Sequence, residues 1–133
     1  MITGIGIDIL EIARLGRTID ISGRHFLEKI FTPSEIAYCE AKAHPAQHFA
    51  ARFAAKEAAV KALGTGIGEH AGWVDLEIRR SPTGAPELVL HGAAAEFAKR
   101  HGIAEVRISL THTKDYAAAN AIALVSPAGR PGA

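Results

Sequence analysis

The protein has 133 residues, of which 48% are hydrophobic, and a formal net charge of +1 at neutral pH. The length suits one domain, and the near-neutral charge excludes the strong basic excess of a dedicated nucleic-acid-binding protein. Cys39 is the only cysteine, which excludes an internal disulfide, and no segment reaches the roughly 20 apolar residues that span a bilayer. The N-terminus also lacks the pattern of a signal peptide. We therefore expect a cytoplasmic protein that binds neither nucleic acid nor membranes.

The first predicted element is a strand over residues 2–10. Three isoleucines alternate with glycine or aspartate, in the period of two typical of a strand. The two faces carry Ile5, Ile7 and Ile9 on one side and Gly4, Gly6 and Asp8 on the other. Because glycine has no side chain, the second face would let another backbone or a ligand approach closely, next to the carboxylate of Asp8.

Helices are predicted after this strand. Apolar residues at helical spacing predict a helix over residues 11–19, and Ser22 and Gly23 interrupt the pattern before a short helix over residues 25–30.

Two further helices have clear start and stop signals. Thr32 as N-cap, with Glu35 completing a capping box, predicts a helix over residues 33–42. A longer helix is predicted over residues 45–63, where Gly64 ends it.

The second half of the chain is rich in strands. Alternating patterns predict strands over residues 73–80, 87–90, 105–113 and 116–125, with a helix over residues 93–101. Helices cluster early and strands late, which favours an α+β fold with a mainly antiparallel sheet packed against the long central helix. We expect a single domain over residues 1–125 and a disordered tail over residues 126–133.

The long helix has no ordinary solvent face. Phenylalanine, valine and leucine form one stripe, and the opposite side is almost entirely alanine, so we expect the helix near the centre of the fold. Arg52 and Lys56 lie one turn apart, and two buried like charges repel each other unless an anion lies between them. This pair therefore predicts an anionic ligand. Glu57 and Lys61 are also one turn apart, in the order that stabilises a helix.

Three segments together resemble a known family. They are GIGIDILEI at residues 4–12, FAARFAAKEAAVKALGTG at residues 49–66 and ISLTHTKDYAAANAIA at residues 108–123. In order and spacing they resemble the holo-acyl-carrier-protein synthases, the short-chain branch of the 4′-phosphopantetheinyl transferases. Thr111 stands where the family pattern usually has serine, and the hydroxyl is retained.

The resemblance implies an activity and a metal site. It implies the phosphopantetheinyl transferase fold and transfer of 4′-phosphopantetheine from coenzyme A to a serine of apo-acyl carrier protein, in fatty acid biosynthesis. The family's metal ligands correspond to Asp8 and Glu57, and magnesium prefers such oxygen ligands beside substrate phosphates. Lys61 would contact the pyrophosphate. Either Glu57 or a metal-bound water that Glu57 orients would accept the serine proton.

The resemblance also implies contacts with coenzyme A. They fall on Arg52 and Lys61 of the long helix, on Gly84 and Pro86 of a hairpin, and on His112 and Thr113 at a strand end. Gly64 begins a glycine-rich loop that follows a helix and not a strand, so this loop is not a phosphate-binding P-loop. Gly64 could still border the ligand.

Two interactions between proteins are expected. Acyl carrier proteins are acidic, and Arg14, Arg17 and Arg24 on the first helix would offer them a cationic docking face. The resemblance further implies a homotrimer with active sites between neighbouring subunits.

Two other hypotheses remain open. A non-catalytic module that binds coenzyme A or a nucleotide could share the fold, although Asp8, Glu57, Lys61 and His112 argue for catalysis. A zinc site could use His44 and His48, which are four residues apart, but the sequence shows neither an HExxH motif nor a third ligand.

Overall fold

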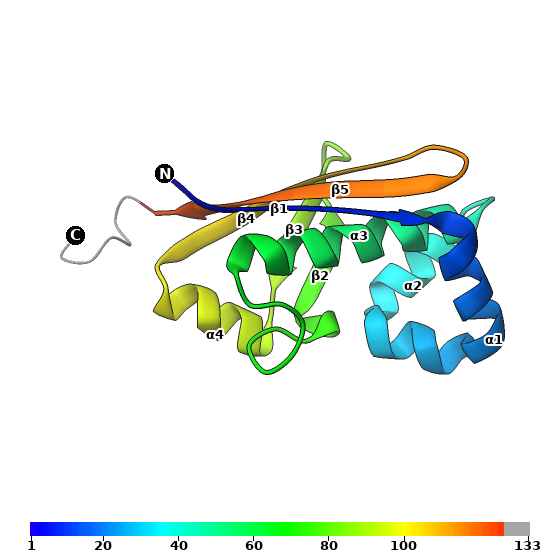
Figure 1. The fold of residues 1–133 in the computed structure, drawn as a ribbon, viewed down its shortest axis with the longest axis horizontal. Helices are drawn as coiled ribbons and strands as arrows, with labels where there is room; N and C mark the ends of the chain where they lie inside the picture. The colour runs from blue at the N-terminus through cyan, green and yellow to red at the C-terminus, as the bar shows by residue number, and fades with distance from the viewer. Residues whose placement is uncertain (127–133) are drawn as a thin grey trace.

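The computed structural model describes residues 1–126, and its elements form two antiparallel sheets around one long helix (Figure 1). In chain order they are β1 Ile2–Glu11, α1 Ile12–Ile30, α2 Pro33–Glu40, α3 Pro45–Leu63, a 3₁₀ turn Trp73–Asp75, β2 Leu76–Arg80, β3 Pro86–Leu90, α4 Gly92–Arg100, β4 Ile103–His112 and β5 Tyr116–Val125. The predicted α+β class is confirmed. The predicted disordered tail lies outside the described residues apart from Ser126. Within residues 1–126, no helix is both long and apolar enough to cross a bilayer.

The larger sheet has the strand order β1-β5-β4, and β2 pairs with β3 in a separate hairpin. Both pairings with β5 are antiparallel, so β1 and β4 are the two edge strands. The sheet covers one side of α3, with α1 and α2 at one end of the molecule and α4 at the other (Figure 1).

Local signals in the sequence determine several helix ends. Thr32 and Glu35 form the predicted capping box at the start of α2, and Gly64 ends α3 in the left-handed conformation with a φ of 82°. Gly23 has a φ of 60° and breaks α1, as predicted. The two halves of α1 nevertheless follow each other directly from Ile12 to Ile30.

One predicted strand begins later than expected. Residues Trp73–Asp75 form a 3₁₀ turn, and β2 starts only at Leu76. The carboxylate of Asp75 accepts a hydrogen bond of 3.0 Å from the Gly72 N–H, which closes a turn where the alternating pattern predicted extended backbone.

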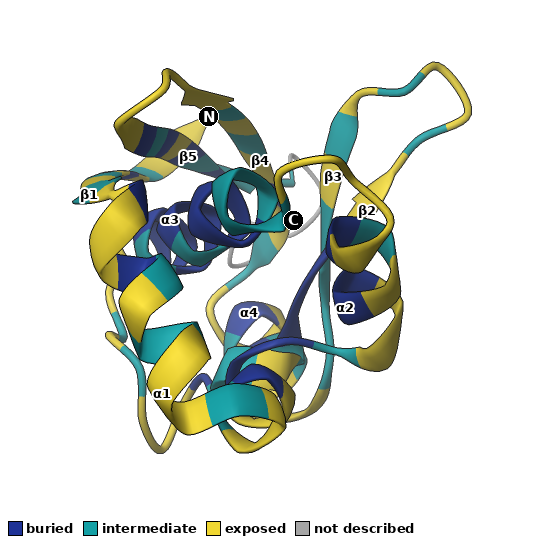
Figure 2. Ribbon diagram, turned by 90° about the vertical axis from the view of Figure 1, so that its right-hand side faces the viewer, coloured by how far each residue is buried: buried dark blue, intermediate teal, exposed yellow. Residues whose placement is uncertain are grey.

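The glycine face of β1 packs directly on the backbone of α3. A Cβ atom placed on Gly4 would lie 1.9 Å from the carbonyl oxygen of Ala62, and one on Gly6 would lie 1.9 Å from that of Ala58. Twelve of the nineteen residues of α3 are buried, which confirms its predicted central position (Figure 2). Since alternate residues of a strand share a face, Asp8 follows Gly4 and Gly6 toward this helix.

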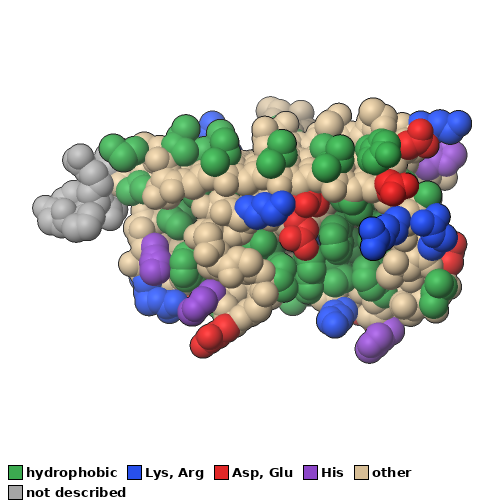
Figure 3. All heavy atoms as spheres, in the orientation of Figure 1, with side chains coloured by type: hydrophobic (Ala, Val, Ile, Leu, Met, Phe, Trp, Pro, Cys, Tyr) green, Lys and Arg blue, Asp and Glu red, His purple; other side chains and the backbone are tan. Residues whose placement is uncertain are grey.

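The opposite face of β1 is open. Ile5, Ile7 and Ile9 are 74%, 69% and 66% exposed. Figure 3 shows hydrophobic side chains in a row along the edge of the molecule where β1 runs. Singly exposed isoleucines are ordinary, but a continuous row on a sheet is typical of a protein interface.

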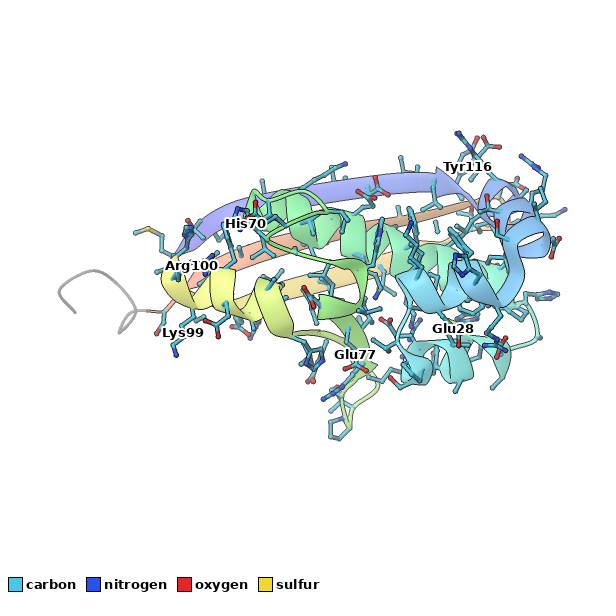
Figure 4. The ribbon with its side chains drawn as sticks, turned by 90° about the horizontal axis from the view of Figure 1, so that it is seen from below. Glu28, His70, Glu77, Lys99, Arg100 and Tyr116 are labelled. Carbon is cyan, nitrogen blue, oxygen red and sulfur yellow. The ribbon has the colours of Figure 1, made fainter. Side chains whose placement is uncertain are left out.

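Glu77 anchors the β2–β3 hairpin to its neighbours (Figure 4). Its carboxylate accepts hydrogen bonds from Ser34 of α2 at 2.7 Å and from Arg79 at 3.0 Å, and it lies 2.9 Å from His91. Burial alone would raise the pKa of Glu77, but the hydrogen bonds from Ser34, His91 and Arg79 outweigh burial and lower the pKa to about 2. The hairpin is thereby held against α2.

Candidate active site

Asp8, Glu57 and Lys61 come together where β1 crosses α3. The Lys61 Nζ lies 3.4 Å from Asp8 Oδ1 and donates a hydrogen bond of 2.8 Å to the carbonyl oxygen of Ile7. Burial raises the pKa of Glu57, and the nearby negative charge of Asp8 raises it further. In Figure 3, acidic and basic side chains lie together near the middle of the face that is turned to the viewer.

This carboxylate pair lines the wall of a cavity. The cavity has a volume of about 480 Å³ and lies between the end of β1, α1 and α3. Its lining combines the polar residues Asp8, Glu57, Glu11, Arg14 and Thr18 with the apolar residues Ile9, Leu10, Leu15, Phe26 and Phe53. Two converging carboxylates in a largely apolar cavity have the chemistry of a small-molecule site.

The prediction of an anionic ligand between Arg52 and Lys56 is wrong for Lys56. Lys56 is fully buried, and its Nζ donates to Glu35 Oε1 at 2.8 Å and to the carbonyl oxygens of Trp73 and Leu76 at 3.0 and 2.6 Å. The anion beside Lys56 is thus a carboxylate of the protein itself. The spacing of charges along α3 gave no sign of this partner, because Glu35 belongs to α2.

Replacing Lys56 with methionine is expected to lower the free energy of unfolding by ~3–5 kcal/mol, because Glu35 would keep a buried charge without its partner. Burial lowers the pKa of Lys56, while the charge and hydrogen bond of Glu35 oppose that shift. Urea unfolding at one fixed protein concentration measures the change.

The control for this prediction is Lys99→Met, since Lys99 is exposed on α4 (Figure 4) and its loss should change stability by less than ~0.5 kcal/mol. Adding Glu35→Gln to Lys56→Met should restore part of the lost free energy of unfolding, because the buried side chain would no longer be charged. A loss of less than ~1 kcal/mol for Lys56→Met alone would contradict the role given to this ion pair.

A second cluster, which we call the cation cluster, contains Lys42, Arg52 and Arg80. All three lie against the ring of Tyr38, with the Arg52 guanidinium 4.0 Å, the Lys42 ammonium 4.6 Å and the Arg80 guanidinium 5.3 Å from its centre. His48 connects this cluster to His112, with its ring 6.0 Å from that of Tyr38 and 5.6 Å from that of His112. The structure thus brings the predicted residues Arg52 and His112 into one region.

The predicted hairpin residues border the same region. Arg80 donates a hydrogen bond to the carbonyl oxygen of Gly84, and Pro86 follows at the start of β3. Thr113 also lies close in sequence to His112, but its hydroxyl accepts the N–H of Tyr116 at 3.1 Å and orders the β4–β5 turn. Gly64 lies at the other end of α3, one residue past Leu63.

The predicted docking arginines differ in their surroundings. Arg14 and Arg17 are exposed on α1, and Arg14 lines the cavity beside Asp8 and Glu57. Arg24 instead forms an ion pair of 3.2 Å with Glu40, so part of its charge is neutralised within the protein.

The zinc alternative has no support in the geometry. His44 is the N-cap of α3 with non-helical backbone angles, so it does not share the regular spacing of the helix with His48. Residues 1–126 contain no group of three or more His, Cys, Asp or Glu side chains arranged to hold a metal ion.

Known proteins match this chain over nearly its whole described length. A sequence model of the 4′-phosphopantetheinyl transferase superfamily matches residues 4–121. The chain belongs to this superfamily. Holo-[acyl-carrier-protein] synthases from Koribacter versatilis and Maridesulfovibrio salexigens are 48% and 51% identical to it, over 92% and 90% of this chain and 98% and 95% of those proteins.

Solved structures of this superfamily share the fold. The holo-[acyl-carrier-protein] synthase of Neisseria meningitidis has a TM-score of 0.87 at 34% identity, covering 93% of this chain and 99% of that one. The Helicobacter pylori enzyme in complex with coenzyme A has a TM-score of 0.80 at 35% identity, covering 90% of this chain and 99% of that one. The family resemblance seen in the sequence is confirmed.

In this phosphopantetheinyl transferase, the two clusters face different sides of α3. Glu57 and Arg52 are five residues apart, which places them about 140° apart around a helix of 3.6 residues per turn. Asp8 belongs to the edge strand β1 and His112 to the opposite edge strand β4. In one copy of the chain, the two predicted halves of the coenzyme A site therefore lie on different sides of α3.

The sequence did not reveal Tyr38, Lys42 and Arg80 as parts of this transferase's cation cluster. They lie in α2, in the loop after it and at the end of β2, and no motif joins these segments. The only available signal was the basic pair Arg79 and Arg80 directly before a turn-forming loop, which is also common on solvent-exposed strands.

Proposed function

We propose that this phosphopantetheinyl transferase moves the 4′-phosphopantetheine group of coenzyme A to a serine of apo-acyl carrier protein, in fatty acid biosynthesis. The products are holo-acyl carrier protein and adenosine 3′,5′-bisphosphate. The observation that carries the proposal is the carboxylate pair Asp8 and Glu57, with Lys61 beside it, at a cavity of about 480 Å³. The chain's named relatives are holo-[acyl-carrier-protein] synthases, and one of them has been solved with coenzyme A.

The donor set at this site fits a divalent cation, which we propose is magnesium. Burial and the charge of Asp8 both raise the pKa of Glu57, and a cation held by the two carboxylates would relieve that repulsion. Magnesium often takes one or two protein carboxylates and leaves its other positions to water and substrate phosphates. When bound, the ion would neutralise charge on the pyrophosphate of coenzyme A and polarise the phosphorus under attack.

Lys61 and Glu57 supply the remaining roles at the reacting phosphate. Lys61 is half exposed, and the Ile7 carbonyl and Asp8 hold its Nζ beside the carboxylate pair, where its ammonium would bind pyrophosphate oxygens. The serine oxygen bonds to the phosphorus of the phosphopantetheine group, and the bond to the phosphate of adenosine 3′,5′-bisphosphate breaks. The serine proton passes to Glu57, or to a water that Glu57 orients.

The cation cluster fits the nucleotide end of coenzyme A. The pyrophosphate is assigned to Lys61 and the carboxylate pair, so the remaining phosphate of coenzyme A is the one on the ribose. Lys42, Arg52 and Arg80 offer three cations to it, and His112, Gly84 and Pro86 border the same region. Thr113 and Gly64 remain proposed contacts from the family pattern.

A homotrimer would bring the two clusters together. They face different sides of α3 in one copy, so a coenzyme A molecule that contacts both would lie between two copies. The exposed row of Ile5, Ile7 and Ile9 gives the sheet an apolar face for such an assembly.

Replacing Ile7 with lysine is expected to convert the trimer into monomers, because a charge would be buried in an apolar interface. Sedimentation velocity measures the mass in solution, and the Michaelis constant for coenzyme A should rise with dissociation. Ile21→Lys is the control, since Ile21 is 86% exposed on α1 and away from the sheet. A variant that stays trimeric at all concentrations would exclude this face as the interface.

Replacing Arg14 with glutamate is expected to raise the Michaelis constant for the acidic carrier protein roughly tenfold, while that for coenzyme A stays within about twofold. Arg14 is exposed at the mouth of the cavity, where the carrier's serine must enter. Steady-state kinetics at two salt concentrations measures both constants, and the effect should weaken at high salt.

Arg100→Glu is the matched control for docking. It makes the same charge change on α4, at the far end of the molecule (Figure 4). An equal rise in both Michaelis constants for Arg14→Glu would argue against a docking role.

Mass spectrometry of an apo-acyl carrier protein tests the activity directly. After incubation with this protein, coenzyme A and magnesium, the carrier should gain the mass of phosphopantetheine. Binding of coenzyme A without that gain would favour the non-catalytic binding module instead.

A further inference from the structure

Tyr38 is the residue on which the cation cluster is built. It lies on α2, and its ring is the common contact of Lys42, Arg52 and Arg80, which come from three different segments. Its hydroxyl accepts a hydrogen bond of 2.7 Å from the Nε of Arg80. One side chain therefore holds two arginines by two different interactions, the face of its ring for Arg52 and its hydroxyl for Arg80.

The cluster has no counter-charge of its own among the described residues. No carboxylate within residues 1–126 forms an ion pair with Lys42, Arg52 or Arg80. Burial by itself raises the pKa of Tyr38, but the hydrogen bond from Arg80 and the charges of Arg80, Arg52 and Lys42 outweigh burial and lower the pKa. Three cations that share one aromatic ring repel each other, and an anion would stabilise the arrangement.

Arg52 shows most directly that a partner is lacking. It is only 4% exposed, and its buried Nε has no hydrogen-bond partner within residues 1–126. Leaving a buried donor unsatisfied is costly, and the cost is greater for a charged group. Lys56, one turn away on the same helix, is paired with the Glu35 carboxylate, whereas Arg52 has no carboxylate partner within residues 1–126.

We infer that Tyr38 is a positioning residue for coenzyme A: it orients Arg52 and Arg80 so that together they receive the ribose phosphate. The inference rests on the proposed function, which assigns the pyrophosphate to the other cluster. Tyr38 does not need to touch the nucleotide. It acts through the two arginines, by keeping their guanidinium groups in place before the ligand arrives.

Two substitutions separate the two interactions of Tyr38. Tyr38→Leu removes both the ring and the hydroxyl, and the Michaelis constant for coenzyme A is expected to rise roughly tenfold. Tyr38→Phe keeps the ring over Arg52 and releases only Arg80, so a rise of about threefold is expected. In both variants kcat and the Michaelis constant for carrier protein should stay within about twofold, which a general loss of structure would not produce.

A binding measurement without catalysis adds a second readout. Calorimetric titration compares adenosine 3′,5′-bisphosphate with adenosine 5′-monophosphate, which lacks the 3′-phosphate of the ribose. The unsubstituted protein should bind the bisphosphate more tightly, and Tyr38→Leu should bring the ratio of the two affinities close to one. Phe97→Leu, on α4 at the opposite end of the molecule from α2, controls for the loss of an aromatic ring.

The outcomes are distinct. If Tyr38→Leu leaves both the Michaelis constant for coenzyme A and the affinity ratio within about twofold of the unsubstituted protein, the inference is overturned. It is also overturned if both nucleotides lose affinity equally, since that result means a structural role. Absence of transfer by the unsubstituted protein would refute the proposed function, and the affinity ratio would still decide the role of Tyr38.

Discussion

Replacing Asp8 with alanine is expected to abolish phosphopantetheine transfer, with a loss of at least about a thousandfold in rate, or ~4 kcal/mol of transition-state stabilisation. Asp8 ends the glycine face of β1, and its carboxylate faces Glu57 and the ammonium of Lys61. Without it, only one carboxylate would remain to hold a cation against the pyrophosphate. Transfer is measured by mass spectrometry of the carrier protein over time.

The fold should survive this substitution. The side chain of Asp8 is 20% exposed and lies at the wall of a cavity, so its removal leaves no packed space empty. Thermal unfolding should be within a few degrees of the unsubstituted protein, and magnesium should no longer bind in a calorimetric titration.

Glutamates provide the matched comparison. Glu57→Gln should lose transfer as Asp8→Ala does, whereas Glu96→Gln, exposed on α4, should retain it. An active Asp8→Ala protein would remove the basis for the metal site.

Replacing Gly6 with alanine is expected to destabilise the protein by at least ~3 kcal/mol, the upper end of the usual cost of overpacking. The added Cβ would lie 1.9 Å from the carbonyl oxygen of Ala58 and 2.9 Å from the backbone nitrogen of Ala62. These are backbone atoms of α3, so no side chain can rotate away. β1 would have to separate from the helix, and Asp8 would move away from Glu57. Urea unfolding and transfer activity measure the two consequences.

Gly16→Ala is the control for this prediction. Its Cβ would meet only the Cβ of Ala46, at the ordinary contact distance of 3.7 Å. Because Gly16 lies inside α1, alanine should there leave stability unchanged or raise it by up to ~1 kcal/mol. Equal behaviour of the two variants would mean that close packing of β1 on α3 does not limit stability.

The order of the elements could be predicted because their signals are local. The capping box of Thr32 and Glu35 and the left-handed Gly64 each depend on a few neighbouring residues, and both lie where the sequence predicted. At α1 the break at Gly23 was predicted, but the helix continues directly on both sides of it. Trp73–Asp75 is a second departure from the prediction. There the Asp75 carboxylate accepts a hydrogen bond from the Gly72 N–H and closes a turn. The alternation of polar and apolar residues cannot predict such a hydrogen bond.

The site was predicted less completely. Asp8 and Glu57 are 49 positions apart, and only the family resemblance paired them before the structure placed them together. The resemblance also predicted that Arg52 and His112 contact coenzyme A, and the structure places both residues in one region. It did not supply Tyr38, which joins them to Lys42 and Arg80 through contacts between α2, α3 and β2.

By itself, the sequence of this protein determined which segments form helices and strands, that α3 is buried, and that β1 has a face bare enough for another backbone. These properties follow from short-range sterics, from helix capping and from the spacing at which hydrophobic residues recur along the chain. Only the tertiary structure decided which backbone covers the glycines of β1, which carboxylate neutralises Lys56, and which side of α3 each half of the site faces. Those outcomes depend on distances between segments far apart in the chain, and Asp8 lies beside Glu57 because Gly4 and Gly6 bring β1 close to α3.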